Sequence, residues 1–325
     1  MDPKLEAELT AHDVSDEKFV DASFRHILRR PPDEEARVRA LAKLSEGTLS
    51  RATLIQELTT SEESARVREL DDAVALGLGA RARSERIRWL QASAGTDERV
   101  VEIPWVLSRL RASGRVLEVG YAFAETAYLG ALLRSGVELV GVDLATRDVE
   151  GMEAVAADVR TLPFPERSFD QVLLVSTIEH IGADNTVYGL DAESDGDARV
   201  EALRELKRVL RTDGSLLVTV PLGEPGDHGW FRQEDERGWN ELFARADFFV
   251  EESEAYELRD DGWHAAPAFR PEGVRYGERG PAASAALCAE LLPGRLRHLA
   301  TPGGLRTATR RRASRAYRRI RPHDL

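Results

Sequence analysis

Residues 115–125, with the sequence RVLEVGYAFAE, decide the fold of this chain. The first five residues are largely apolar, as in a parallel strand that is covered on both faces. Gly120 follows, and glycine permits a sharp turn because it adopts positive φ without steric cost. Leucines on one stripe of residues 124–135 then predict a helix. A strand that feeds a helix N-terminus leaves backbone N–H groups pointing at whatever lies above the turn.

Further strands follow at intervals that suit an α/β fold. Because only 11 residues separate Asp143 from Val155, we expect a turn or loop there instead of a crossover helix. Asp143 ends the second strand, where an acidic residue can accept hydrogen bonds from two ribose hydroxyls. The sequence predicts a doubly wound α/β sheet, with further strands at 138–144, 155–158, 169–176, 215–221, 248–257 and 284–292 and a helix at 200–211.

Five motifs accompany these elements in a fixed order. They are VLEVG at 116–120, VGVDL at 140–144, ADVRTLPFP at 157–165, SFDQV at 168–172 and LKRVLRTDGSLLVTVP at 206–221. Together they resemble the class I S-adenosylmethionine (SAM)-dependent methyltransferases. The flanks ERVVEIPWVLSRL at 98–110 and DHGWF at 227–231 are similar to a subset linked to cell-surface polysaccharides and sugar modification. The resemblance implies a Rossmann-like methyltransferase sheet with SAM as the cofactor.

The resemblance also implies a set of cofactor-binding residues. Glu118 and Gly120 would border the methionine part of SAM. Asp143 would bind the ribose hydroxyls, and Asp158 would face the adenine amino group with the backbone of Val159 beside the ring. The set is completed by Tyr121 and Ala122 in the turn, Leu144 at the end of the second strand, and Ser176 under the sulfonium.

The turn departs from the Gly-x-Gly-x-Gly pattern of the resembled family. Its second and third glycines are replaced by Ala122 and Ala124. One extra methyl group is tolerable at each position if φ is negative there. A dinucleotide-binding oxidoreductase is the competing interpretation of such a turn. The alanines argue against it, because pyrophosphate needs the close backbone approach that the second glycine allows.

The end of the fourth strand, residues 176–182, is the expected place of the chemistry. Methyl transfer needs a nucleophile with a lone pair, a straight approach and exclusion of water. A hydroxyl nucleophile gains from a base, and His180 has a suitable ordinary pKa. The alternative is that His180 is structural and forms a hydrogen bond across the strand end. Both roles stay open at this point.

The segment DHGWF at 227–231 holds a second candidate base, His228. Its aromatic residues suit stacking on a sugar ring or a planar substrate, and we expect Trp230 to contribute a wall of the acceptor site. The alternative is a loop packed by its own aromatic residues.

A long polar connection, residues 181–198, follows the fourth strand and is interpreted as a lid over the acceptor. Its acidic residues suit a hydroxyl-rich or cationic acceptor, and a purely connecting loop is the alternative. We expect Glu179, Asp184 and Tyr188 to contact the substrate. No metal is predicted, because Ser176 stands where some related enzymes have an additional Glu that holds a divalent ion.

Residues 1–75 predict a separate all-α domain. Four helices are expected, the last running through Leu70, and residues 19–28 show a core-facing stripe. The segments FVDASFRHILRRPPD and LSRATLIQELTTSEE resemble a phycobilisome-linker-like helical module of unknown function that often accompanies glycosyltransferases. It has no catalytic cluster, so we interpret it as a docking module for a protein partner.

Three further segments complete the predicted organisation. Residues 76–98 form a linker with a helix at Ser84–Ala92. Residues 99–293 form the SAM-dependent methyltransferase domain, entered by a helix that Pro104 interrupts. Residues 294–325 form an Arg-rich tail.

Charge is unevenly distributed along the chain. The net charge is −12, yet residues 295–325 hold ten Arg and a single acid, which leaves about −21 on the rest. An acidic body disfavours nucleic acid as a partner, because such affinity comes from cationic neutralisation of phosphates. The tail suits an anionic membrane surface. The N-terminal sequence has no signal-peptide pattern and Cys288 is the single cysteine, so we expect a cytoplasmic protein, peripheral at the inner membrane if the tail binds lipid.

The function expected from the sequence is O-methylation of a hydroxyl on a sugar, glycan or glycan-related acceptor. The acceptor class follows from the resemblance alone. Two alternatives stay open: a small-metabolite methyltransferase of the quinone or polyketide type, and a non-catalytic SAM-fold scaffold that recruits glycan enzymes.

Overall fold

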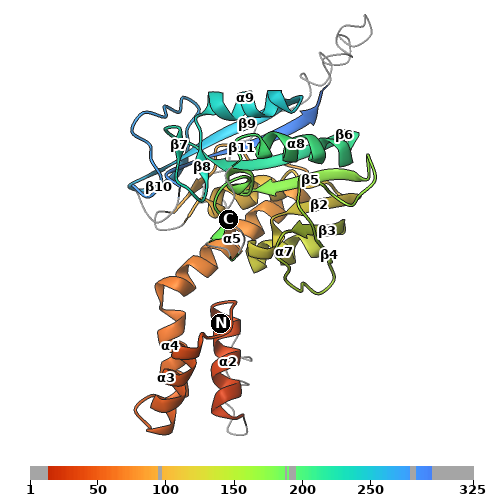
Figure 1. Ribbon diagram of the computed structural model, residues 1–325. Coiled ribbons are helices and arrows are strands. Elements are labelled where there is room, and N and C mark those ends of the chain that lie inside the picture. The colour runs from red at the N-terminus through yellow and green to blue at the C-terminus, as the bar shows by residue number, and fades with distance from the viewer. Residues whose placement is uncertain (1–13, 94–96, 187–188, 190–194, 279–282, 295–325) are drawn as a thin grey trace, which may run out of the picture. The chain divides into compact units, whose positions relative to one another are not determined.

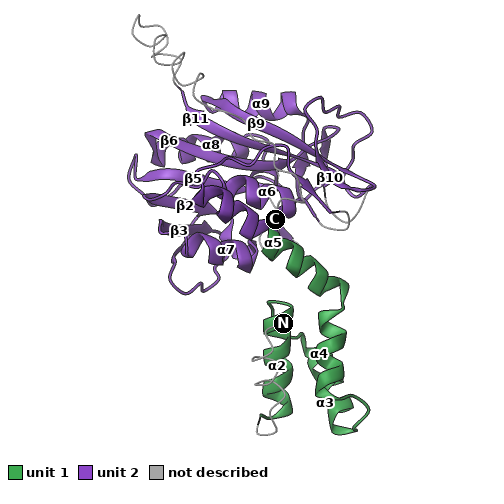
Figure 2. Ribbon diagram, turned by 180° about the vertical axis from the view of Figure 1, so that it is seen from behind, with its two compact units in different colours: residues 1–72 green, residues 73–325 purple. Residues whose placement is uncertain are grey.

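The structure is a computed structural model and describes residues 14–93, 97–186, 189, 195–278 and 283–294 (Figure 1). The chain divides into two compact units, residues 1–72 and 73–325 (Figure 2). Each unit has its own hydrophobic core.

The N-terminal unit is helical, as predicted. Its described part consists of α2 (Asp16–Ile27), α3 (Glu34–Ser45), α4 (Arg51–Thr59) and the first turns of α5 (Glu62–Ala82). Side chains of Ser15, Asp33 and Ser50 cap α2, α3 and α4 by accepting hydrogen bonds from backbone N–H groups. The apolar stripe of α2 packs against α4 in a core that includes Phe19, Val20, Phe24, Leu54 and Ile55.

Helix α5 runs farther than predicted, to Ala82, through a segment that we expected to be a linker. Gly77 explains the difference. A Cβ atom at Gly77 would lie 2.8 Å from the Cβ of Leu107, so the missing side chain lets this part of α5 approach α6 (Arg99–Leu107) closely. The glycine that suggested a loose linker therefore permits close helix packing.

The predicted helix at Ser84–Ala92 is wrong. The segment is irregular and ends in β1 (Gln91–Ala92), which pairs with β10 (Gly262–Ala265). Arg86 and Arg88 bind Glu252 at 2.7 and 2.6 Å. These two ion pairs tie the segment to one buried carboxylate, and periodicity along residues 84–92 cannot reveal so distant a partner.

The sheet has nine strands among the described residues, in the order β1-β10-β9-β11-β6-β5-β2-β3-β4. The strands β4, β3, β2, β5 and β6 are parallel, and β11, β9, β10 and β1 continue the sheet in antiparallel pairs. The order reverses beside β2, where such sheets open a crevice at their carboxyl edge. The bounds are β2 Arg115–Val119, β3 Glu138–Asp143, β4 Glu153–Ala156, β5 Phe169–Val175, β6 Leu210–Pro221, β9 Phe248–Arg259 and β11 Ala285–Pro293.

Helices cover both faces of the sheet. Helices α8 (Ala198–Val209) and α9 (Glu236–Arg245) lie together on one face (Figure 1). Helices α6 and α7 (Thr126–Leu133) lie on the other (Figure 2). Short 3₁₀ turns, η1 (Tyr121–Phe123) and η2 (Ile178–His180), follow β2 and β5, and the small hairpin of β7 (Gly226–Asp227) and β8 (Arg232–Gln233) follows β6. The doubly wound α/β prediction is confirmed.

The connection after β3, the proline in α6 and the single cysteine each have a defined place in the structure. Residues 144–152 contain no helix, as predicted. Pro104 does not interrupt α6, although it removes one backbone donor from that helix. Cys288 is fully buried in β11, where its thiol packs as a small apolar side chain. Within the described residues, no helix is long and apolar enough to cross a membrane.

Candidate active site

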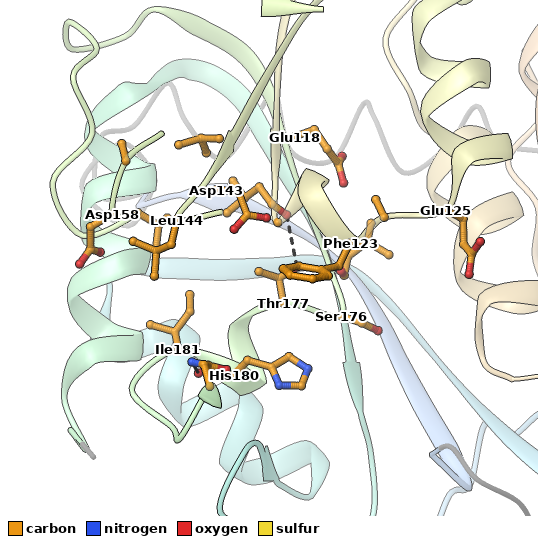
Figure 3. A pocket seen from close by; sticks show the side chains of 18 of the residues that line it. Glu118, Phe123, Glu125, Asp143, Leu144, Asp158, Ser176, Thr177, His180 and Ile181 are labelled. Carbon is orange, nitrogen blue, oxygen red and sulfur yellow. Dashed lines mark hydrogen bonds between the residues drawn. The ribbon is translucent and has the colours of Figure 1, made fainter. Parts of the chain in front are cut away.

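A cavity of about 430 Å³ opens at the carboxyl ends of β2, β3 and β5 (Figure 3). Asp158 and Glu125 lie at opposite ends of it, with Asp143 and Phe123 between them (Figure 3). The structure therefore brings together at one cavity the predicted site residues that lie between Glu118 and His180 in the sequence. Of the predicted site residues, those that line the cavity are Glu118, Gly120, Asp143, Leu144, Asp158, Val159, Ser176 and His180.

Gly120 forms the tight turn that the sequence predicted. Its φ of 86° is left-handed, and a Cβ atom there would lie 2.5 Å from Oγ1 of Thr177. The turn after β2 therefore closes against the end of β5. Ala124 has φ −69°, so the alanine in place of the third family glycine fits without strain.

The carboxylate of Asp143 is fixed by two backbone donors. Its Oδ2 accepts a hydrogen bond from the N–H of Ala122 at 3.0 Å, and its Oδ1 accepts one from Ala145 at 3.1 Å. Burial raises the pKa of Asp143, and these backbone bonds oppose that rise. The side chains of Leu144 and Phe123 expose 54% and 55% of their surface and line the cavity beside it. Phe123 was not singled out from the sequence.

Asp158 is held by a cation that the sequence analysis did not consider. Arg160 binds it through Nη2 at 2.6 Å and through Nε at 3.0 Å. The hydrogen bonds from Arg160 lower the pKa of Asp158. The Asp158 carboxylate is therefore ionised and held in a fixed orientation. Arg160 itself also lines the cavity.

Two predicted cofactor residues do not line the cavity. Tyr121 is fully buried, and Gly141 on β3 leaves the space for its ring, because a Cβ atom there would lie 2.8 Å from it. Ala122 contributes through its backbone N–H to Asp143. The turn places the Tyr121 ring against the sheet, so the predicted contribution of Tyr121 to the cofactor site would come from its backbone.

Ser176 directly follows β5 and has a left-handed conformation with φ 40°. Its hydroxyl donates to both carboxylate oxygens of Glu102, at 2.9 and 3.0 Å. Glu102 is fully buried on α6 and also binds Arg99 at 2.6 Å. Arg99 lines the cavity. Arg99 and Glu102 were not predicted as site residues: they lie in segment 98–110, before the first strand, and nothing in the sequence pairs Glu102 with Ser176.

His180 lies at the floor of the cavity with a defined tautomer (Figure 3). Its Nδ1 is 2.9 Å from the carbonyl oxygen of Trp230, and a carbonyl only accepts hydrogen bonds. Nδ1 therefore carries the proton, and the lone pair is on Nε2. Burial lowers the pKa of His180, although the bond to Trp230 opposes this change. The imidazole is neutral at neutral pH, as a base requires.

Two carboxyl groups near the cavity are buried and protonate easily. Burial raises the pKa of Glu118 to about 8, and the Tyr128 hydroxyl that donates to it at 2.9 Å limits the rise. Burial also raises the pKa of Glu179 to about 8. Glu179 is 3% exposed and does not line the cavity, so its expected contact with the substrate is not supported by its position.

The segment 227–231 packs beside His180. The Trp230 ring stacks on the His180 ring with 5.1 Å between centroids. His228 is exposed, and its ring stacks on Phe231 at 4.5 Å. His228 is not among the residues that line the cavity, which favours the alternative of an aromatic-packed loop.

The described part of the predicted lid contributes one wall. Asn185 lines the cavity, and its side-chain N–H₂ donates to the carbonyls of His180 and Ala183. Asp184 is exposed and does not line the cavity. Its backbone N–H donates to Gly229, which joins the two loops. Tyr188 lies outside the described residues. No group of three His, Cys, Asp or Glu side chains suited to a metal occurs in the described ranges.

Comparison with known proteins gives two family matches. Residues 117–218 match the family described as a methyltransferase domain. Residues 4–67 match a domain of unknown function (DUF4214). A curated relative, the probable tRNA methyltransferase 9B of Homo sapiens, is 27% identical over 136 residues, which are 40% of this chain and 27% of that protein. The chain thus spans about a quarter of that relative's length.

Solved structures were matched as well. The 1,6-didemethyltoxoflavin-N1-methyltransferase of Burkholderia thailandensis, solved with S-adenosylhomocysteine, is 17% identical with a TM-score of 0.41. The match covers 84% of this chain and 90% of that one. A SAM-dependent methyltransferase from Methanosarcina mazei is 12% identical with a TM-score of 0.41, covering 59% of this chain and 97% of the other.

Proposed function

Because residues 117–218 form a methyltransferase domain that uses SAM, we propose that this protein methylates a hydroxyl group of a sugar, glycan or glycan-related acceptor. The observation that carries the proposal is the state of His180. Its side chain lines the cavity, is neutral, and has the Nε2 lone pair that can take a hydroxyl proton.

The residues present fit SAM. Asp143 offers carboxylate oxygens, oriented by two backbone N–H groups, to the ribose hydroxyls. The exposed faces of Phe123 and Leu144 offer apolar contact to adenine, and Asp158 is an acceptor for its amino group. A volume of about 430 Å³ falls in the range of small-molecule sites.

The reaction needs a proton acceptor and a dry, oriented site. When bound, SAM would supply a methyl group on its sulfonium sulfur, and transfer to the acceptor oxygen would break the carbon–sulfur bond. His180 takes the hydroxyl proton on Nε2. The bond from Nδ1 to the Trp230 carbonyl holds the ring and fixes the tautomer. Ser176 and Thr177 close the wall between the cavity and β5.

A sugar-related acceptor is supported by the resemblance of segments 98–110 and 227–231 to sugar-associated methyltransferases. The second segment lies beside the proposed base, because the Trp230 indole stacks on the His180 ring with 5.1 Å between centroids. An aromatic face next to the base suits stacking on a sugar ring.

The test is transfer of labelled methyl from SAM to three sets of acceptors: sugars and glycans, phenolic and quinol metabolites, and tRNA. We expect label in the first set, in a product stable to conditions that hydrolyse esters. Label in the metabolites alone would assign the small-molecule alternative. Absence of SAM binding in calorimetry would favour a non-catalytic scaffold.

RNA is the second candidate because the curated relative is named a probable tRNA methyltransferase. The charge of about −21 on the residues before the Arg-rich tail weighs against a polyanion. Residues 295–325 lie outside the described ranges. Label in tRNA, lost on deletion of residues 295–325, would assign this function.

A further inference from the structure

Arg99 lies outside the family match yet reaches the cavity. It belongs to α6, which precedes β2, whereas the match begins at residue 117. Its side chain is 28% exposed and lines the cavity. The methyltransferase motifs therefore do not describe every charged group that a ligand meets here.

The guanidinium of Arg99 has donors left for a ligand. Within the described residues it donates one hydrogen bond, from Nη1 to Glu102 at 2.6 Å. A guanidinium carries five N–H donors in a planar fork that matches a carboxylate. Since the remaining donors belong to a partly exposed side chain on the cavity wall, they are placed to bind an anionic group inside it.

The charge of Arg99 acts at one end of the cavity. Burial raises the pKa of Glu118 and of Glu125, and the charge of Arg99 opposes both rises. Glu125 lies at the end of the cavity opposite Asp158 (Figure 3). The other lining guanidinium, that of Arg160, is bound to Asp158 at 2.6 Å. The two guanidinium groups therefore act at different ends of the cavity, Arg160 at the Asp158 end and Arg99 at the Glu125 end.

We propose that Arg99 binds the carboxylate of the methionine part of SAM and that Glu125 binds its ammonium group. Glu125 lines the same cavity and makes no side-chain hydrogen bond among the described residues. A fork-shaped cation and a carboxylate at one end match the two opposite charges of an amino acid. This inference rests on the proposed function, since it concerns the same cofactor.

The position of Arg99 is fixed by a buried carboxylate. Glu102, fully buried, holds Arg99 on one side and accepts the Ser176 hydroxyl on the other. A guanidinium anchored in this way loses little freedom when it binds a ligand. The same arrangement links the amino-acid end of the cofactor site to the tip of β5.

The test compares three ligands by calorimetry with the full chain. They are SAM, decarboxylated SAM, which lacks only the carboxylate, and 5′-methylthioadenosine, which lacks the whole amino acid. In Arg99→Gln we expect affinity for SAM to fall roughly 10- to 100-fold, with the other two ligands unchanged within about twofold. In Glu125→Gln we expect SAM and decarboxylated SAM to weaken together, and methylthioadenosine to bind as before.

Two controls keep the result clear. Arg99→Lys retains the positive charge but not the planar array of N–H donors. Its loss of affinity for SAM should therefore be smaller than that of Arg99→Gln. Arg160→Gln, at the adenosine end, should weaken all three ligands equally. Equal weakening of SAM and decarboxylated SAM in Arg99→Gln would overturn the inference and leave the proposed function standing. Failure of the unaltered chain to bind SAM would overturn the proposed function, and the inference with it.

Discussion

The imidazole of His180 is held by Trp230 in two ways: Nδ1 lies 2.9 Å from the Trp230 carbonyl oxygen, and the two rings stack with 5.1 Å between centroids. The hydrogen bond places the proton on Nδ1, and the stacking orients the ring. Residues 50 positions apart in sequence thus form one unit at the end of β5. This unit determines where a proton can be accepted.

His180→Ala should reduce methyl transfer by about 10²- to 10⁴-fold, the usual contribution of a general base, with SAM affinity little changed. His228→Ala is the matched control, because His228 is exposed and does not line the cavity, and it should stay within a few-fold of the unaltered protein. Rates come from labelled SAM and affinities from calorimetry. Similar losses in both variants would assign a catalytic role to the 227–231 loop as well.

The rate should also depend on pH in a defined direction. A base works in its neutral form, and burial lowers the pKa of His180 from its ordinary value of 6.5. The value of kcat/KM should therefore be constant at neutral pH and fall on acidification through a pKa below 6.5. A profile that falls between pH 7 and 8 on acidification would contradict this assignment.

Gly120→Ala should impair both stability and SAM binding. The left-handed φ costs about 1–2 kcal/mol for a residue with a side chain, and the new Cβ would lie 2.5 Å from Oγ1 of Thr177. Gly136→Ala is the control, because Gly136 has φ 82° but nothing within 4 Å of its Cβ position. Both variants should lose thermal stability, whereas only Gly120→Ala should also lose SAM affinity.

Asp143→Asn should weaken SAM binding by roughly 10- to 100-fold, because a charged acceptor for the ribose is lost. The fold should persist, since the asparagine oxygen still accepts one of the two backbone bonds that fix Asp143. Asp148→Asn, an exposed change in the loop that follows β3, should have no effect on affinity. Calorimetry on the three proteins checks this, and unchanged affinity in Asp143→Asn would remove Asp143 from the site.

Glu252→Gln should destabilise the second unit by about 3–5 kcal/mol, as expected when a buried ion pair loses one partner. Arg109, fully buried, lies 2.6 Å from Glu252, and Arg86 and Arg88 bind the same carboxylate. Burial alone would raise the pKa of Glu252, but these cations hold it below its ordinary value. The contribution to stability is therefore present above the ordinary carboxyl pKa and lost as pH falls through the lowered pKa of the folded state.

Urea unfolding at neutral and acidic pH measures this effect, with the exposed neighbour Glu251→Gln as the control. The difference in unfolding free energy between the two variants should shrink as the pH falls. A difference that is independent of pH would mean that the carboxylate charge is not what stabilises the fold.

Sequence patterns were informative wherever a local rule sufficed. The strand before Gly120, the acid that ends β3 and the missing helix after Asp143 follow from apolar runs, turn residues and crossover length. The ion pairs of Arg86 and Arg88 with Glu252 and the hydrogen bond of Ser176 to Glu102 could not be predicted, because the partners lie 74 or more positions apart in sequence. His228 and His180 look equivalent as sequence, and only packing separates an exposed ring from one that lines the cavity.

The reach of α6 into the cavity bears on how this enzyme should be dissected. A fragment cut at residue 117, where the family match starts, would lack Arg99 and leave Ser176 without its acidic partner. It would also lack Arg86 and Arg109, so the buried carboxylate of Glu252 would lose these cationic partners. An excised catalytic core should therefore start upstream of Gly77, and shorter expression products should be insoluble or unable to retain SAM.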